Sequence, residues 1–104
     1  MATKAVELKK MKAGKGCLGK AAAGEPIFIL RSSDKFAPEV IRDWCMKVIR
    51  ARHHEWMQTL SPQDQDKATR GLLSPPKLPK VDEARKLAKA MEKYATKHGS
   101  KVPD

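Results

Sequence analysis

The most regular pattern of apolar and polar positions in the chain begins at Pro38 and continues to Leu60. Its apolar residues recur at intervals of three and four: Val40, Ile41, Trp44, Cys45, Val48, Ile49 and Trp56. This spacing places apolar side chains on one wide face of an α-helix, and proline fits the first position of a helix. The pattern therefore predicts one long amphipathic helix over 38–60.

Local end signals predict a shorter helix on each side of this one. The first runs over 3–12, with Thr3 as the N-cap and Gly14 just beyond the C-terminal end. The second runs over 62–70, with Ser61 as the N-cap and proline at the first helical position.

A last helix is predicted from Asp82 to His98, because acidic residues lie in its first turn and basic residues in its last, as the helix dipole favours. Its apolar residues form a narrow stripe with nearly heptad spacing: Val81, Ala84, Leu87, Ala88, Met91 and Tyr94. A stripe of this kind can also pair with a second copy of the chain. The 82–98 helix is therefore one of two candidate surfaces for a homodimer.

The stretch "EPIFILRSSD" contains the one strand candidate, an extended or β segment over 26–32. Its apolar residues Ile27–Leu30 are consecutive, which predicts burial on both sides. A single strand cannot satisfy its own backbone hydrogen bonds. We therefore expect the segment either to pair with the same segment of a second copy, through Ile27–Leu30, or to cross the core as extended chain.

The fold class predicted from these elements is mostly α, with three or four helices packed around the segment 26–32. The length of 104 residues fits a single small domain. Within it we distinguish a basic, glycine-rich N-terminal region over 1–23, a proline-rich connector over 71–80 and a frayed tail over 99–104.

The charge is strongly positive, with a formal net charge of +10 and a sequence pI of about 9.9. The excess lies at the two ends of the chain, in residues 1–20 and 77–101, and consists mainly of lysine. Lysine favours diffuse phosphate contact over bidentate recognition of bases. The composition therefore predicts a non-catalytic binding protein for an anionic ligand, either nucleic acid or a nucleotide.

Three groups of residues are candidates for binding the anion. They are Lys12, Lys15 and Lys20 around the glycines, then Arg31, Ser32, Ser33 and Lys35 before the long helix, and finally Lys86, Lys89 and Lys93 on the last helix. The middle group places donors beside a helix start, where anions are favoured. Its structural alternative is an ion pair between Arg31 and Asp34, with a serine capping a turn.

Two motifs of enzymes are present only in part. "AGKGCLGK" satisfies both G-x-G-x-x-G and G-x-x-x-x-G-K, but no strand precedes it, and Ala21 stands where a phosphate loop needs Ser or Thr. "HHEWMQ" has Gln58 where a zinc-protease helix needs its second histidine. We therefore expect no catalytic residues, no metal site, no cofactor and no enzymatic activity.

The cysteines and the apolar runs indicate the compartment. Cys17 and Cys45 are too few for a disulfide framework and are expected to be reduced thiols. The N-terminus has no apolar region of a secretory signal, and the longest apolar run, "PIFIL", is far too short for a membrane helix. These features predict a cytoplasmic protein without a membrane partner.

The block "GEPIFILRSSDKFAPEVIRDW", Gly24–Trp44, resembles a segment of small phage and prophage proteins. In these proteins an E-P-I-F-x-L-R stretch leads through a D-x-x-A-P turn into a helix that carries Val and Trp. The resemblance covers about a fifth of the chain and implies an accessory protein of a mobile element that acts by binding. It supports an alternative function, an inhibitor or adaptor that binds an acidic host protein, for example of a defence system, by adding Ile27–Leu30 to an exposed strand.

Overall fold

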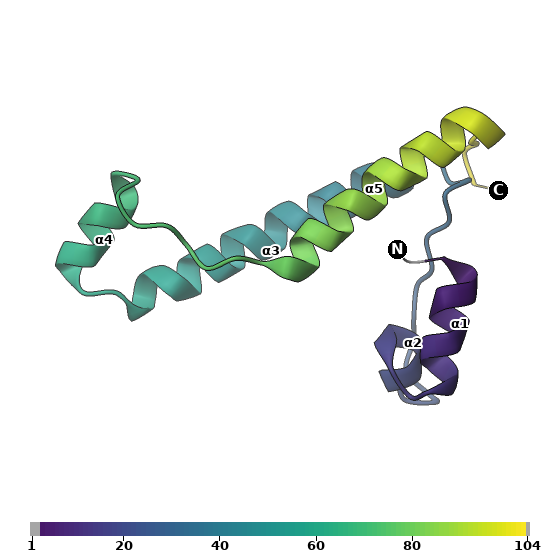
Figure 1. Ribbon diagram of the computed structural model, residues 1–104, viewed down its shortest axis with the longest axis horizontal. Helices are drawn as coiled ribbons and strands as arrows, with labels where there is room; N and C mark the ends of the chain where they lie inside the picture. The colour runs from purple at the N-terminus through teal and green to yellow at the C-terminus, as the bar shows by residue number, and fades with distance from the viewer. Residues whose placement is uncertain (1–2, 104) are drawn as a thin grey trace. The chain divides into compact units, whose positions relative to one another are not determined.

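The computed structural model describes residues 3–103, which form helices, one isolated β-bridge and no β-strand. The helices are α1 (Lys4–Lys12), α2 (Gly16–Lys20), α3 (Ala37–Thr59), α4 (Pro62–Thr69) and α5 (Pro79–His98), as Figure 1 shows. The predicted fold class, mostly α, is confirmed.

The ends of three helices follow from the residues that predicted them. Thr3 Oγ1 accepts a hydrogen bond from the backbone N–H of Val6 at 3.3 Å, and Ser61 Oγ accepts one from Asp64 N–H at 3.2 Å. Both bonds satisfy a backbone donor that a helix N-terminus leaves without a partner. Pro38 lies in the first turn of α3. These local predictions are confirmed to within a residue or two.

Contacts divide the chain into two compact units, Met1–Arg31 and Ser32–Asp104, where the sequence predicts a single domain. The segment 26–31 before the boundary forms neither helix nor strand. Its side chains are open to solvent, with Ile27 55%, Phe28 83% and Ile29 66% exposed. The structure therefore does not support the prediction that helices pack around this segment. The helices of the second unit bury their apolar residues against each other, so the segment is not part of their core.

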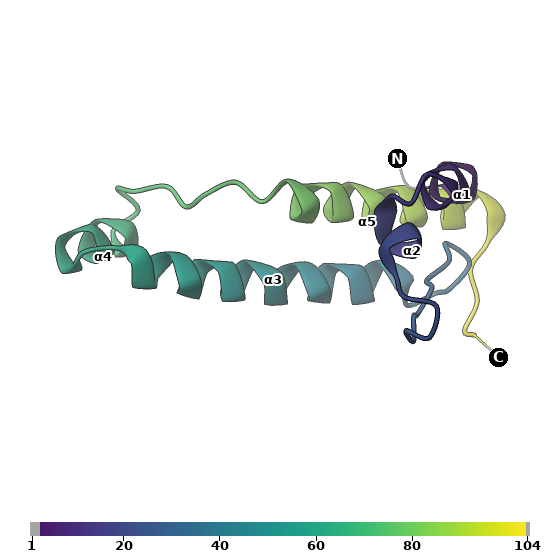
Figure 2. The ribbon, with the colours of Figure 1, turned by 90° about the horizontal axis from the view of Figure 1, so that it is seen from below.

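The core of the second unit is the contact between α3 and α5, which lie side by side and antiparallel in Figure 2. Its buried apolar residues are Ala37, Cys45, Val81, Ala88 and Met91. Several are small, which lets two helices approach closely. Cys45 Sγ reaches the carbonyl oxygen of Val81 at 3.8 Å. We call this contact the α3–α5 seam.

The wide apolar face predicted for α3 is only partly buried. Trp44 of α3 is 49% exposed and Tyr94 of α5 is 53% exposed, although both belong to the predicted stripes. The main helix contact of α3 is with α5, so only a narrow seam is shielded from water. The apolar residues on its flanks remain at the surface.

The helix α5 begins at Pro79, three residues before the predicted Asp82, so the connector between α4 and α5 is shorter than predicted. Figure 2 shows α5 alongside only part of α3, with the extended connector running opposite the C-terminal part of α3. This arrangement leaves the last turns of α3 without α5 beside them. There Gln65 of α4 donates from Nε2 to the Met57 carbonyl at 3.0 Å.

The tail after α5, which is predicted to be frayed over 99–104, returns to the second unit at Lys101. Gly99 adopts φ 88°, and the chain then pairs with the segment before α3 through a parallel bridge between Asp34 and Lys101. Lys101 N–H donates to the Ser33 carbonyl and Lys35 N–H donates to the Lys101 carbonyl, each at 2.9 Å. These bonds join the tail to the start of α3 and close this end of the α3–α5 hairpin. No local pattern in the sequence of the tail predicts them.

A substitution in the α3–α5 seam tests this core. We expect Ala88→Leu to lower the free energy of unfolding by about 1–3 kcal/mol, because Ala88 is fully buried and the seam has no room for three more carbons. The measurement is urea unfolding followed by circular dichroism. The control, Ala51→Leu, lies on an exposed position of α3. Equal midpoints for the two variants would show that the seam is not tightly packed.

Candidate nucleic-acid interface

Four lysines form a stripe on the outer face of α5. Lys86, Lys89 and Lys93 were predicted, and the structure adds Lys97 in the last turn. Their spacing of three, four and four residues keeps them on one face of a helix, opposite the seam residues Ala88 and Met91. All four are exposed. The stripe is about 16 Å long at 1.5 Å per residue. We call these four residues the lysine stripe.

The lysine stripe keeps its positive charge unpaired. None of its members takes part in an ion pair within residues 3–103, whereas the nearby acid Glu92 pairs with Arg42 of α3. Asp82 lies in the first turn, where a negative charge is favoured by the helix dipole. The acidic side chains near the stripe are thus engaged elsewhere or lie at one end, and the middle of the face is open to an anion.

The predicted lysines of the first unit also lie at its surface. Lys12 ends α1, Lys15 precedes α2 and Lys20 ends α2, and all three are exposed. No ion pair engages these three within the described residues, while the neighbouring Lys10 pairs with Glu7 at 3.7 Å. Basic residues at helix C-termini also stabilise the helices themselves. The first unit therefore offers a second, separate group of cations.

The glycines of "AGKGCLGK" have a structural role. Gly14 adopts φ 70°, its N–H donates to the Met11 carbonyl at 3.0 Å, and Lys15 N–H donates to the Lys10 carbonyl at 2.8 Å. These two bonds form a Schellman motif, which ends α1 and occupies two amides that a phosphate-binding loop would need. A Cβ on Gly19 would lie 2.8 Å from the Gly14 carbonyl carbon. The glycines thus let α2 pack against the end of α1.

The third predicted group, Arg31, Ser32, Ser33 and Lys35, lies just before the start of α3. The carboxylate of Asp34, within this segment, already bonds to the backbone. The Asp34 carboxylate accepts a hydrogen bond from Phe36 N–H at 2.8 Å, next to the first turn of α3. Ser32 and Ser33 are half-buried, whereas Arg31 and Lys35 are exposed. No ion pair joins Arg31 to Asp34 within residues 3–103. A carboxylate thus lies where an anion would otherwise meet the helix.

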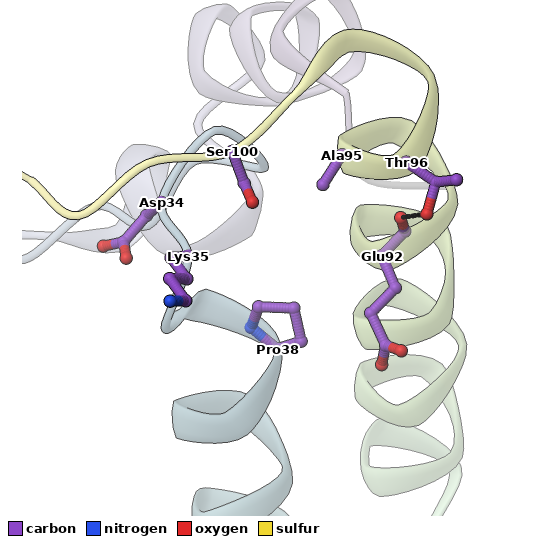
Figure 3. A pocket seen from close by; sticks show the side chains of 7 residues that line it. All are labelled: Asp34, Lys35, Pro38, Glu92, Ala95, Thr96 and Ser100. Carbon is purple, nitrogen blue, oxygen red and sulfur yellow. Dashed lines mark hydrogen bonds between the residues drawn. The ribbon is translucent and has the colours of Figure 1, made fainter.

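A small hollow of about 280 Å³ lies near this end of the hairpin. It is lined by Asp34, Lys35, Pro38, Glu92, Ala95, Thr96 and Ser100. In Figure 3 Pro38 of α3 lies across from Glu92 of α5, and Thr96 Oγ1 donates to the Glu92 backbone carbonyl at 2.9 Å. With two carboxylates and one lysine, the hollow does not suit a phosphate. The described residues also contain no cluster of three potential metal ligands.

A larger hollow of about 880 Å³ lies between the C-terminal half of α3 and the connector, and the sequence did not predict it. Its apolar lining comes from Trp44, Val48, Ile49, Trp56, Pro75, Pro76 and Leu78. We call it the α3–connector groove. One signal was available: the apolar stripe of α3 continues past residue 48, yet the chain that lies opposite is proline-rich and cannot continue α5.

The chain was compared with protein-family models, with curated proteins and with solved structures, and none of the three comparisons finds a match. In residues 3–103 every helix is too short or too polar to cross a lipid bilayer. The chemistry of the exposed lysines is therefore the main guide to the ligand.

The structural role of Gly19 gives a test. We expect Gly19→Ala to loosen the first unit, because the new Cβ would collide with backbone rather than with a movable side chain. Trypsin should then cleave after the lysines of 4–20 several-fold faster. The control is Gly24→Ala, where a Cβ would meet no atom within 4 Å. If Gly19→Ala resists trypsin as well as the unchanged chain, the glycine is not needed for packing.

Proposed function

We propose that this protein binds nucleic acid through its phosphate backbone, without catalysis, and that the lysine stripe of α5 is the main contact. The observation that carries the proposal is the row of Lys86, Lys89, Lys93 and Lys97 on one exposed face, with no ion pair within the described residues. Phosphate contacts from lysine supply most of the free energy of sequence-independent binding.

The shape of the basic surface favours a polymer over a single nucleotide. A nucleotide is usually held in a concave pocket with a few convergent polar groups. The two hollows described above are not basic, since one contains two carboxylates and the lining of the other is mainly apolar. The lysine stripe is instead linear and open, which suits the repeating charges of a nucleic-acid strand.

The stripe also favours contact with phosphates over recognition of bases. Lysine acts as a point charge and lacks the planar fork with which arginine recognises guanine. The aromatic residue beside it, Tyr94, packs against His98, with ring centroids 4.2 Å apart. We therefore propose binding with little sequence preference, to DNA or RNA.

The first unit would add a second contact on the same polymer. Its exposed lysines Lys12, Lys15 and Lys20 are joined to the second unit by the extended segment 26–31. Two linked binding units raise the effective concentration of the second after the first has bound. The resemblance of Gly24–Trp44 to phage proteins is in keeping with a nucleic-acid-binding accessory protein of a mobile element.

Salt dependence tests this proposal. We expect fluorescence anisotropy with labelled mixed-sequence duplexes to give a steep linear fall of log K with log salt, because bound counterions are released. Replacing the four lysines of the stripe with glutamine should reduce the slope by up to about 0.9 for each phosphate that the variant no longer neutralises. Binding should weaken equally for all sequences.

The control removes the same charge elsewhere, with glutamine at Lys47, Arg50, Lys67 and Lys77, all exposed and outside the stripe. The control should keep more of the slope than the stripe variant. Equal reductions would mean that only net charge matters and that the stripe is not the interface. No binding even at low salt would reject nucleic acid and favour the acidic host protein as partner.

A further inference from the structure

Two apolar surfaces of the chain are left without cover in the described structure. One is the extended segment 26–30, in which Phe28 is 83% exposed. The other is the α3–connector groove. We propose that the protein forms a homodimer in which residues 26–30 of each copy occupy the α3–connector groove of the other. This pairing is independent of nucleic-acid binding.

The groove is open because its two walls differ in length and kind. One wall is the continuous helix α3, and the other is the connector with Pro75, Pro76 and Leu78. Prolines lack the N–H needed to extend a helix backwards from α5, so no helical side chains fill the space. The indole rings of Trp44 and Trp56 line it, and large apolar surfaces of this kind mark interaction sites.

Charged groups line the groove as well, but the principal pair is already satisfied. Arg52 and Glu55 form an ion pair at 3.0 Å, and His53 packs against Trp56 with ring centroids 5.7 Å apart. Lys80, at the start of α5, also lines the groove, is exposed and takes part in no ion pair within the described residues. Most of the lining is nevertheless apolar, so an occupant with apolar side chains fits it best. Residues 26–30, Pro-Ile-Phe-Ile-Leu, carry no charge at all.

Size and conformation agree with this occupant. A groove of about 880 Å³ has room for a phenylalanine and its two isoleucine neighbours, which occupy on the order of 500 Å³ together at the close packing of a protein interior. The segment belongs to no helix, so no secondary structure has to unfold before it binds.

The reach of the chain favours the groove of a second copy over its own. The hydrogen bonds between Lys101 and the segment Ser33–Lys35 fix the chain at the start of α3. From Ser32, the four residues back to Phe28 span at most about 14 Å. The groove begins at Trp44, about 10 Å along α3 from Ala37, but its middle, at Ile49–Trp56, lies about 18–28 Å from Ala37 and is beyond this reach. A second copy has no such restriction.

The buried area is also adequate for a dimer. Three apolar side chains and the groove surface that they cover amount to about 600 Å² for each insertion. A reciprocal exchange contains two insertions, and the total of about 1,200 Å² is at the lower limit for specific interfaces. We therefore expect a reversible dimer rather than a permanent one.

Sedimentation equilibrium tests the proposal, without nucleic acid and at a salt concentration that suppresses phosphate binding. We expect the wild-type chain to show a dimer mass at micromolar concentration. Phe28→Ser removes the inserted ring, and Trp56→Gln removes part of the groove. Each should weaken dimerisation about tenfold or more, because less apolar area is buried. The matched control is Leu72→Ser, since Leu72 is 72% exposed but outside the groove and the segment.

A mixture of the two variants gives the decisive result. A Phe28→Ser chain keeps an intact groove and a Trp56→Gln chain keeps an intact segment, so an equal mixture regains one of the two insertions. We expect a heterodimer that is weaker than wild type but stronger than either variant alone. If Trp56→Gln does not fold, Ile49→Gln serves as the groove variant.

Three results would overturn the proposal. If the wild-type chain stays monomeric at several hundred micromolar, a second copy is not the occupant of the groove. A dimer that persists in Phe28→Ser uses a different surface, such as the 82–98 helix. A change of tryptophan fluorescence in Phe28→Ser without any change in mass would mean that the segment covers the groove of its own chain. None of these results bears on the salt-dependent binding of nucleic acid.

Discussion

The small side chains of the α3–α5 seam are the constraint on which the second unit depends. Three of these residues are almost completely buried: Ala37, Cys45 and Ala88. Because their side chains are small, α3 and α5 can pack closely against each other. A two-helix contact shields only a narrow stripe from water. The remaining apolar residues of α3 stay at its flanks, while every lysine of the stripe on α5 is directed to solvent. The exposed groove and the exposed lysine stripe therefore both result from the narrow contact between two helices.

The closure of the hairpin decides where these two surfaces lie. At one end, Lys101 N–H donates to the Ser33 carbonyl and Lys35 N–H donates to the Lys101 carbonyl, and these bonds hold the tail to the start of α3. At the other end, α4 and the proline-rich connector separate α3 from α5. Because the connector is extended, it covers the C-terminal half of α3 less completely than a helix would. The groove therefore lies at the connector end, and the lysine stripe runs along the opposite side of α5.

The parts of the fold that depend on neighbouring residues could be predicted, and those that depend on distant ones could not. Thr3, Ser61 and Pro38 mark helix starts through bonds and angles within one turn, so the bounds of α1, α3 and α4 follow from the sequence. The burial of Ile27–Leu30 was predicted from apolar character alone, yet it requires a partner layer that the small seam does not provide. The pairing of the tail with the start of α3 depends on a contact between Lys101 and residues far earlier in the chain, for which the sequence contains no local signal.

The candidate site shows the same division. The lysines of α5 could be assigned to one face because helical spacing fixes their direction, whatever the tertiary structure. The role of the glycine motif could not be predicted for the opposite reason: a positive φ at Gly14 and a close approach at Gly19 are compatible with helix packing as well as with phosphate binding, and only the tertiary structure distinguishes the two. The α3–connector groove could not be predicted, because its position depends on which part of α3 lacks α5 beside it.

The lysine stripe and the apolar groove lie on different parts of this hairpin. Binding through the lysine stripe is weakened by salt, whereas binding through the apolar groove is not. Their different responses make it possible to study the two surfaces one at a time in the intact chain.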